Sequence, residues 1–219
     1  MKIYIYEFGE AGAGQEFAEG GASHKLLMRA IPGRSEADIL CTPQGKPYFA
    51  EGPHFSISHT GRKGKMLWAM AVSDDGPVGF DLQEIRPVDY IKIAERFFTA
   101  EEADYIKRLV HEGSAGDDAV LNEFYRIWCR KEAFVKYTGR GFAETGFDSF
   151  SVLGEDGTPA EKIRVCGIDA VFTECGKYVL SPDLAGRCVC VICSATQVGS
   201  IEKVVGLSNI CYTVNQKIK

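Results

Sequence analysis

The 219-residue sequence has no apolar run that approaches the roughly 20 residues that a membrane-spanning helix needs. It also has no low-complexity tract, so neither a membrane-spanning nor a disordered protein is expected. The glycine-rich loop of many nucleotide hydrolases is missing, which counts against that class of Mg²⁺-dependent phosphotransferase. The net charge of −5 argues against a general nucleic-acid binder.

Eight cysteines are present, but they lack the regular spacing of a disulfide scaffold and the paired Cys-x-x-Cys or Cys/His sets of a zinc site. Cys188, Cys190 and Cys193 lie in an apolar run that reads as a strand. We interpret them as reduced thiols that fill a core, since a free cysteine packs as a small hydrophobic residue. The first residues alternate like a strand and not like a signal peptide, and a cytoplasmic protein is the default expectation.

With 45% hydrophobic and 25% charged residues, the chain can bury a substantial core as one large domain or two small ones. Alternation and turn signals predict strands at Lys2–Tyr6, His54–His59, Met66–Val72, Val78–Gln83, Ser149–Leu153, Ile168–Thr173, Tyr178–Leu180 and Cys188–Cys193. Helical patterns predict helices near 23–30, over Tyr90–Arg96, from a capping box at Thr99, and from Ala119 to about Tyr137 before Gly139. We expect residues after Val198 to form a loosely held tail.

This order of elements predicts an α+β fold. Strands lead into a helix in the first part, and helices lead into strands in the second. We therefore expect two similar α+β lobes related by a pseudo-two-fold, residues 1–97 and residues 98–219. The active site would lie in the cleft between them.

The strand at Val78–Gln83 offers the first candidate site. Alternate side chains of a strand point to opposite faces, so Phe80 and Leu82 would pack inward. Asp81 and Gln83 would then share the other face, away from the core. Two neighbouring oxygen donors suit Mg²⁺, which takes few protein ligands and completes its shell with water and phosphate. A solvated or turn-supporting aspartate is the competing interpretation.

Glu132 and Lys136 offer the second candidate site, because residues four apart share a helix face. A surface ion pair of a few tenths of a kcal/mol is the ordinary interpretation of such spacing. However, the apolar neighbours Trp128, Phe134 and Val135 predict a largely buried helix. A charged pair on a buried helix is costly unless it has a function, and a catalytic role is one such function.

Ser58 and His59 precede a glycine turn at the end of a predicted strand, where such a pair could grip a phosphate. A structural histidine that bonds to nearby backbone fits these residues equally well. Alternation places Ser56, Ser58 and Thr60 on one face of the strand and His59 on the other.

Five segments in register resemble the 4′-phosphopantetheinyl transferases, over roughly residues 24 to 155. The segments are Gly45–Pro47, Phe55–Gly61, Gly79–Asp81, Phe97–Glu102 and Trp128–Ala133. The length is similar to that of the monomeric, two-lobed surfactin-type branch, and unlike the single-lobed, trimeric holo-acyl-carrier-protein synthases. The resemblance implies transfer of the phosphopantetheine arm of coenzyme A to a serine of an apo acyl or peptidyl carrier protein, with release of 3′,5′-ADP.

The resemblance also implies roles. Asp81 and Glu132 would coordinate Mg²⁺, and Lys136 would act near the scissile phosphate as leaving-group acid or electrostatic clamp. Glu132 would accept the proton of the carrier serine, directly or through a metal-bound water. The adenosine 3′-phosphate of coenzyme A would be held by Lys25, Lys46, Ser58 and His59.

Two departures from the family pattern stand out. The usual second acid of the metal site is Gln83 here, whose amide oxygen is neutral, and Glu84 would face the opposite way. Only about 23 residues precede the segment that contains Lys25, and we expect weaker coenzyme A binding as a result. A catalytically impaired homologue that only binds coenzyme A or a carrier protein is therefore the alternative function.

An acidic carrier protein would need a basic surface. Basic residues lie along the predicted long helix: Arg126, Arg130, Lys131, Lys136 and Arg140. For Arg126 and Arg140, a solvated helix face is the competing interpretation.

Overall fold

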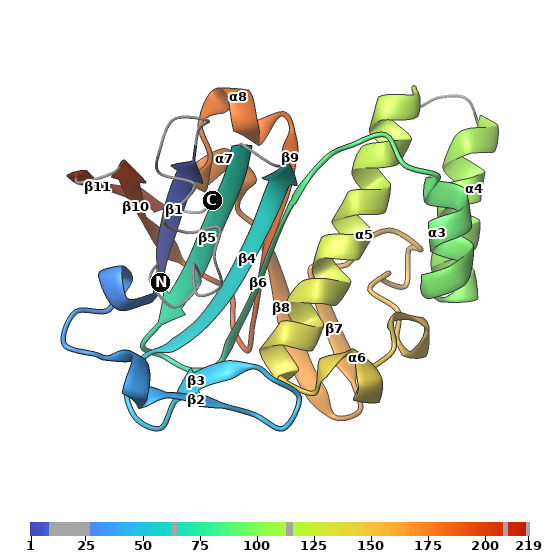
Figure 1. Ribbon diagram of the computed structural model, residues 1–219. Coiled ribbons are helices and arrows are strands. Elements are labelled where there is room, and N and C mark those ends of the chain that lie inside the picture. The colour runs from blue at the N-terminus through green and yellow to red at the C-terminus, as the bar shows by residue number, and fades with distance from the viewer. Residues whose placement is uncertain (9–26, 63–64, 113–115, 208–209, 218–219) are drawn as a thin grey trace.

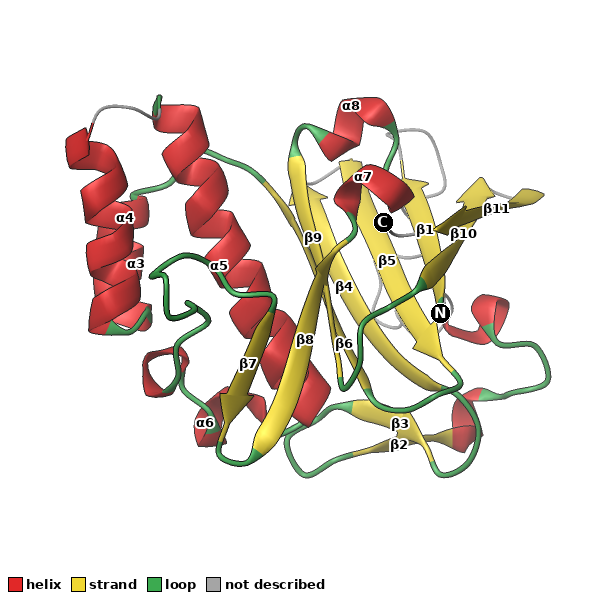
Figure 2. Cartoon of the chain, turned by 180° about the vertical axis from the view of Figure 1, so that it is seen from behind, coloured by secondary structure: helices red, strands yellow, loops and turns green. Residues whose placement is uncertain are grey.

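A computed structural model describes residues 1–8, 27–62, 65–112, 116–207 and 210–217, and it has the predicted α+β fold. Two sheets and a short ribbon form the β part (Figures 1 and 2). The first sheet has the order β11 (Ile210–Lys217), β10 (Ser200–Leu207), β1 (Lys2–Phe8), β5 (Lys65–Ser73) and β4 (His54–Arg62). The second has the order β6 (Val78–Glu84), β9 (Cys188–Ser194), β8 (Ile168–Glu174) and β7 (Lys162–Val165). The ribbon pairs β2 (Ile39–Cys41) with β3 (Pro47–Phe49).

Both sheets combine strands from the two ends of the chain. β1 pairs antiparallel with β5 and parallel with β10, and β6 pairs antiparallel with β9. Strands from either side of residue 97 therefore lie in the same sheet. The division into lobes at residue 97, with its pseudo-two-fold, stays a prediction.

The helices gather beside the second sheet. α5 (Asp117–Thr138) lies between the sheets and the pair α3 (Tyr90–Phe97) and α4 (Ala100–Glu112), as Figures 1 and 2 both show. Short helical segments complete the chain: η1 (Glu36–Asp38), α6 (Gly141–Glu144), η2 (Phe147–Ser149), α7 (Gly176–Val179) and α8 (Pro182–Ala185). No helix in the described ranges is long and apolar enough to cross a membrane.

The predicted helix ends are confirmed. Thr99 and Glu102 bond reciprocally at the start of α4, each side chain accepting from the other residue's backbone N–H, as a capping box requires. α5 ends at Thr138, and Gly139 caps it with the left-handed φ of 70° that glycine adopts without a Cβ clash.

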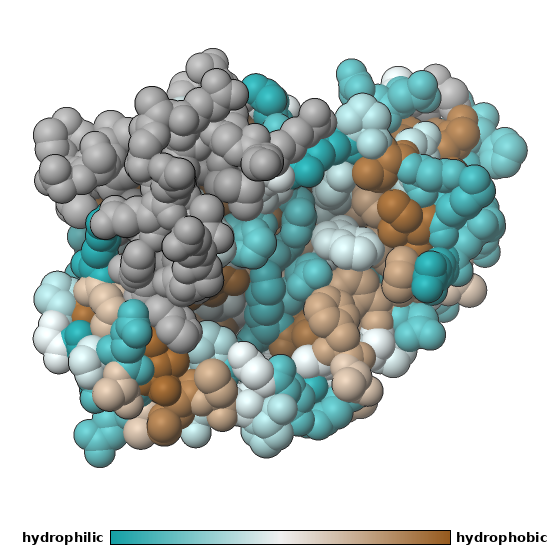
Figure 3. Space-filling view, viewed as in Figure 1, coloured by the Kyte–Doolittle hydropathy of each residue, from teal (hydrophilic) through white to brown (hydrophobic). Residues whose placement is uncertain are grey.

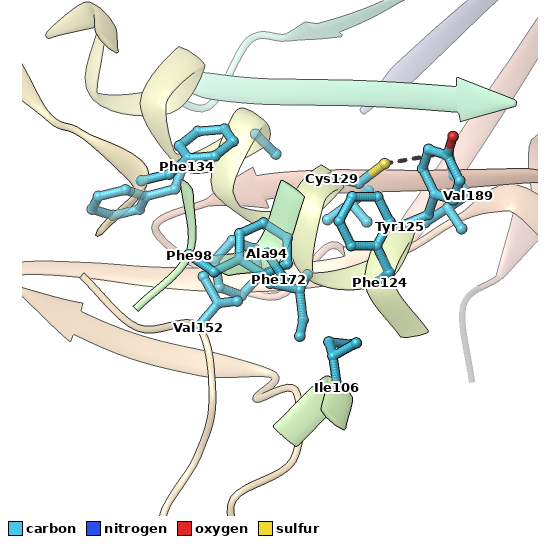
Figure 4. Close-up of a cluster of buried hydrophobic side chains, with 14 of the residues drawn as sticks. Ala94, Phe98, Ile106, Phe124, Tyr125, Cys129, Phe134, Val152, Phe172 and Val189 are labelled. Atoms are coloured by element: carbon cyan, nitrogen blue, oxygen red, sulfur yellow. Dashed lines mark hydrogen bonds between the residues drawn. The ribbon is translucent and has the colours of Figure 1, made fainter. Parts of the chain in front are cut away.

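One apolar cluster packs α5 against α3, α4 and the second sheet (Figure 4). Phe98 and Phe124 stack with ring centroids 5.4 Å apart, and Ile106 is fully buried beside them. A second cluster fills the space between the two sheets with Phe80, Leu82 and residues of β1, β5 and β9. Cys188, Cys190 and Cys193 are all buried, which confirms the interpretation that they fill a core.

Three sequence predictions are wrong. Ser149–Leu153 is no strand: η2 covers its start, and only Leu153 makes an isolated bridge. Tyr178–Leu180 lies largely in the short helix α7. Residues after Val198 do not trail loosely, because β10 adds to β1 and buries Ile201. Of the helix predicted near 23–30, only residues 27–30 are described, and they are helical.

Candidate active site

Gly79 brings β6 and α5 unusually close together. A Cβ at position 79 would lie 1.8 Å from the carbonyl oxygen of Ala133 and 2.5 Å from the backbone nitrogen of Tyr137. Only glycine allows this approach, because contacts under 3.0 Å do not occur between real Cβ atoms and their neighbours. The approach sets Asp81, two residues along β6, against the face of α5 that carries Glu132 and Lys136.

Hydroxyl groups of β4, in the first sheet, bond to β6, in the second sheet, and so join the two sheets. The side chains of Ser56, Ser58 and Thr60 are buried on one face of β4, and His59 is on the other, as alternation predicts. These three hydroxyls accept hydrogen bonds from the backbone N–H groups of alternate β6 residues, at 3.0, 3.2 and 3.0 Å: Phe80, Leu82 and Glu84. The edge of β6 thus donates its N–H groups to side-chain hydroxyls of β4 and not to the backbone of a neighbouring strand. Each of these three N–H groups has an acceptor.

Asp81 is the centre of a polar network. Its side chain is 1% exposed, so the expectation that it faces away from the core is wrong: it faces α5 and is buried there. Oδ1 accepts from Lys136 Nζ at 2.7 Å and from Ser58 Oγ at 2.8 Å. Oδ2 accepts from Gln83 Nε2 at 3.3 Å. A buried polar group needs hydrogen-bond partners of this kind, and Asp81 has them from β4, β6 and α5.

Glu132 lies on the same helix face, one turn before Lys136. Burial raises the pKa of Glu132 to about 7, with repulsion from Asp81 adding to the rise and Lys136 opposing it. Burial would lower the pKa of Lys136, but Asp81 and Glu132 outweigh it, and the pKa of Lys136 is raised. At neutral pH Lys136 is therefore protonated, and Glu132 is poised between its two forms.

A pocket of about 370 Å³ opens beside this network. Its walls come from the turn between β2 and β3, from β4, and from the C-terminal end of α5 with α6. Polar lining residues include Gln44, Lys46, His59, Glu132 and Lys136, and the apolar ones include Phe55 and Phe142. Figure 3 shows a column of hydrophilic residues over β4, bordered by α5, on this face of the molecule.

His59 and Lys46 reach the pocket from different elements. The His59 ring lies 4.2 Å from the ring of Trp68 on β5. Burial lowers the pKa of His59, and Lys136 lowers it further. The Lys46 amine donates to the backbone oxygen of Lys136 and lies 3.5 Å from the carbonyl oxygen of Tyr137, at the negative end of the α5 dipole. Burial lowers the pKa of Lys46 to about 8.

The prediction that basic residues of α5 form an exposed surface is wrong for most of those residues. Lys131 is fully buried and forms a 2.7 Å ion pair with Glu102, which is fully buried as well. Arg130 is buried and pairs with Glu174, and Arg126 pairs with Glu123 and Glu174. Of the predicted set, only Arg140 is exposed.

The Glu102–Lys131 pair fixes the segment after α6. Lys131 donates to the backbone oxygens of Phe147 and Phe150, and Glu102 accepts from the N–H of Val152 at 2.8 Å. Side-chain bonds thus hold the stretch that alternation assigns to a strand. The capping box at Thr99 pointed to Glu102, but nothing local linked it to Lys131.

The structure brings Asp81, Gln83, Glu132 and Lys136 together, with Lys46 and His59 at the adjoining pocket. Ser58 is 4% exposed and does not line the pocket. Lys25 lies outside the described residues. Glu84 faces elsewhere, as predicted, and pairs with Arg86 and Arg187.

Sequence reasoning missed the function of Gly79, for which a glycine inside a buried strand was the available signal. It also missed Gln44, which lines the pocket and whose amide donates to the carboxylate of Glu144.

The donor set fits a hard divalent cation. Two carboxylates and an amide oxygen are the ligand types that Mg²⁺ takes, with water and phosphate in the remaining positions. The repulsion that helps raise the pKa of Glu132 is what a cation between two carboxylates would relieve. Among the described residues, no three His, Cys, Asp or Glu side chains are grouped so that they could hold a metal ion.

Comparisons with known proteins agree with this arrangement. A model of the 4′-phosphopantetheinyl transferase superfamily matches residues 77–185, which include Asp81, Glu132 and Lys136. The 4′-phosphopantetheinyl transferase psf-1 of Bacillus pumilus is 40% identical over 116 residues, 52% of this chain and 44% of that protein. Sfp of Bacillus subtilis is 35% identical over 141 residues, 60% of this chain and 57% of that protein.

AcpT of Salmonella typhimurium, also a 4′-phosphopantetheinyl transferase by name, is 34% identical over 167 residues, 74% of this chain and 77% of that protein. This chain belongs to the 4′-phosphopantetheinyl transferase superfamily. The similarity to psf-1 and Sfp supports the surfactin-type branch. The matches span about half the length of these two relatives, 44% and 57%.

Proposed function

We propose that this chain transfers the 4′-phosphopantetheine group of coenzyme A to a serine of an apo acyl or peptidyl carrier protein, releasing 3′,5′-ADP. One observation carries the proposal: Asp81 of β6 and the Glu132 and Lys136 pair of α5 meet beside a pocket that Lys46 and His59 line. Relatives named for this activity support it.

We assign Mg²⁺ to Asp81 and Glu132, with the amide oxygen of Gln83 as the third donor. When bound, Mg²⁺ supplies charge neutralisation at the pyrophosphate, the largest need of phosphoryl transfer. Because Gln83 is neutral, the site carries two negative charges where the family pattern has three. Its affinity for the cation is correspondingly lower.

Glu132 suits the task of general base. The carrier serine must lose its proton as its oxygen bonds to phosphorus, and a base works best with a pKa near the working pH. The pKa of Glu132 is about 7 in the metal-free protein, and a cation bound to the carboxylate would lower it, so Glu132 would be ionised and able to accept a proton. The acceptor of the proton is the Glu132 carboxylate, and the phosphorus–oxygen bond to 3′,5′-ADP breaks as the new bond forms.

Lys136 suits the task of electrostatic clamp. Asp81 holds its ammonium group at 2.7 Å, and its raised pKa keeps it charged at neutral pH. A fixed cation that faces the pocket stabilises the negative charge that builds up on the leaving 3′,5′-ADP. A strongly held proton makes Lys136 a poor acid, so we assign it the clamp.

Coenzyme A is expected to enter the pocket with its 3′-phosphate toward His59 and Lys46. His59 is exposed at the pocket, and Lys46 supplies an amine with a weakened proton affinity that a phosphate would restore. Lys25 stays a predicted contributor from outside the described residues. We further propose a cytoplasmic location, since buried free thiols such as Cys129 and Cys190 suit a reducing compartment. We propose a monomer from the resemblance to the surfactin-type branch.

Intact-protein mass spectrometry tests the proposal. Apo acyl carrier proteins and apo peptidyl carrier proteins are incubated with the chain, coenzyme A and Mg²⁺. A mass gain of one phosphopantetheine group is expected, and it should vanish with a chelator and in the variants D81N and E132Q.

A second measurement separates the alternative function. Calorimetry of the same preparation with coenzyme A reports binding independently of transfer. Binding without a mass gain on any carrier protein would contradict the transferase and identify a homologue that only binds coenzyme A.

A further inference from the structure

Ser58 occupies a position that does not suit a ligand of coenzyme A. Its hydroxyl is buried, does not line the pocket and makes four contacts within the protein. It donates to Asp81 Oδ1 at 2.8 Å, with the carbonyl oxygen of Leu82 at 3.5 Å, and it accepts from Leu82 N–H at 3.2 Å and from Lys136 Nζ at 3.3 Å. A serine hydroxyl has one donor and two acceptor sites, so these contacts use all of them.

The contacts treat the two oxygens of Asp81 differently. Ser58 and Lys136 bond to Oδ1 at 2.8 and 2.7 Å, whereas Oδ2 accepts from the Gln83 amide at 3.3 Å. The buried thiol of Cys129 also interacts with the Asp81 carboxylate. A carboxylate held at one oxygen by two donors is fixed in rotation about its Cβ–Cγ bond. Oδ2 therefore stays beside the Gln83 amide and is the oxygen that neither Ser58 nor Lys136 occupies.

We propose that Ser58 is a positioning residue that acts through Asp81: its hydroxyl holds Oδ1 and so presents Oδ2 to the divalent cation. The proposal rests on the proposed function for the identity of the cation site, and it replaces the role of Ser58 as a phosphate ligand. Partners that orient a metal ligand typically account for about 10- to 100-fold in metal affinity.

The hydroxyl series of β4 offers a matched control. Thr60 is buried on the same face and accepts from Glu84 N–H at 3.0 Å, as Ser58 accepts from Leu82 N–H. Thr60 also bonds to Arg86 but has no contact with Asp81 among the described residues. T60V therefore removes a hydroxyl that joins β4 to β6 and leaves the Asp81 network intact. S58A removes the comparable bond together with the hold on Asp81.

The first measurement is Mn²⁺ binding in the presence of coenzyme A, with electron paramagnetic resonance of free Mn²⁺ as the readout. Thermal unfolding is recorded for every variant. We expect S58A to weaken Mn²⁺ binding about 10-fold or more, and T60V to leave it within about 2-fold of the wild type. S58T keeps the hydroxyl and should restore most of the affinity. Equal effects of S58A and T60V would overturn the proposal, because loss of sheet joining would then explain both.

The second measurement is a double-mutant cycle with D81N. If Ser58 acts through Asp81, S58A should add nothing further to the loss of Mn²⁺ affinity in D81N. The affinity for 3′,5′-ADP in a chelator should be the same for the wild type and S58A. A loss of 3′,5′-ADP affinity that S58A causes equally in both backgrounds would overturn the proposal and make Ser58 a phosphate ligand.

These readouts do not depend on group transfer. Mn²⁺ binding that needs Asp81 and Ser58, in a protein that modifies no carrier protein, would support the positioning role and contradict the transferase. If the wild-type protein binds no Mn²⁺ in the presence of coenzyme A, the positioning role is overturned, whether or not a carrier protein is modified.

Discussion

The backbone of α5 at Ala133 lies so close to Gly79 of β6 that the strand has no room for a side chain there. This contact sets the separation between the two elements that hold Asp81, Glu132 and Lys136. The site therefore depends on a residue without functional groups.

Substitution of Gly79 by alanine should be costly. The added Cβ would meet backbone atoms, which cannot move aside as a flexible side chain can, and overpacking of this kind costs about 1–3 kcal/mol or more. We expect G79A to lower the free energy of unfolding in urea by that amount and to lose transfer activity. G186A is the control, because its Cβ would meet nothing within 4 Å. Equal stability of the two variants would contradict the close approach.

The buried pair of Glu102 and Lys131 should behave as a unit. K131M removes one member and leaves the Glu102 charge without its counter-ion in the core, which costs about 3–5 kcal/mol. E102Q combined with K131M removes both charges and should regain a large part of the loss. Urea unfolding of the two variants measures this. A double variant less stable than K131M would show that the pair does not act through charge compensation.

Phosphate binding by Lys46 predicts a pH dependence. The pKa of Lys46 is about 8 in the free protein, and a bound phosphate would raise it, so the complex holds more protons above pH 8. The affinity for 3′,5′-ADP should be highest below pH 8 and fall by up to about tenfold per pH unit above it. Calorimetry from pH 7 to 10 measures the profile, and K46R, which stays charged, should flatten it. A wild-type profile as flat as that of K46R would exclude Lys46 as a phosphate ligand.

Gln83 invites a change toward the family pattern. In Q83E a carboxylate would face Asp81 Oδ2 in place of an amide that donates to it. Without divalent cations we expect a lower melting temperature, since like charges repel, and with Mn²⁺ roughly tenfold tighter binding, about 1.4 kcal/mol. Transfer activity should be retained. Complete loss of activity in Q83E would mean that Gln83 does something other than donate an oxygen to the cation.

The sequence predicted the parts of the site that depend on local periodicity. Asp81 and Gln83 share a strand face, and Glu132 and Lys136 share a helix face, because periods of two and 3.6 residues require it. What periodicity could not predict was how much of each face would be covered by other elements. The burial of Asp81, and of Lys131 on the supposed basic face, follows from packing between elements distant in sequence.

The errors in secondary structure have the same cause. Val152 is fully buried and its N–H is satisfied by Glu102, so this apolar stretch needs no neighbouring strand. β10 pairs with β1, whose partner residues Lys2 and Glu202 stand 200 positions apart, and no local pattern announces such a pairing. The α+β class was predictable because it rests on the order of elements alone.

The pairing of β1 with β10 also has a consequence for synthesis on the ribosome. β1 is translated before its antiparallel neighbour β5, which follows about seventy residues later, but its other edge stays open until β10 leaves the exit tunnel. An open edge can recruit strands from other nascent chains. The time between translation of β5 and of β10 is thus the interval in which this protein is most exposed to misassembly, and the interval in which a chaperone would contribute most to its yield.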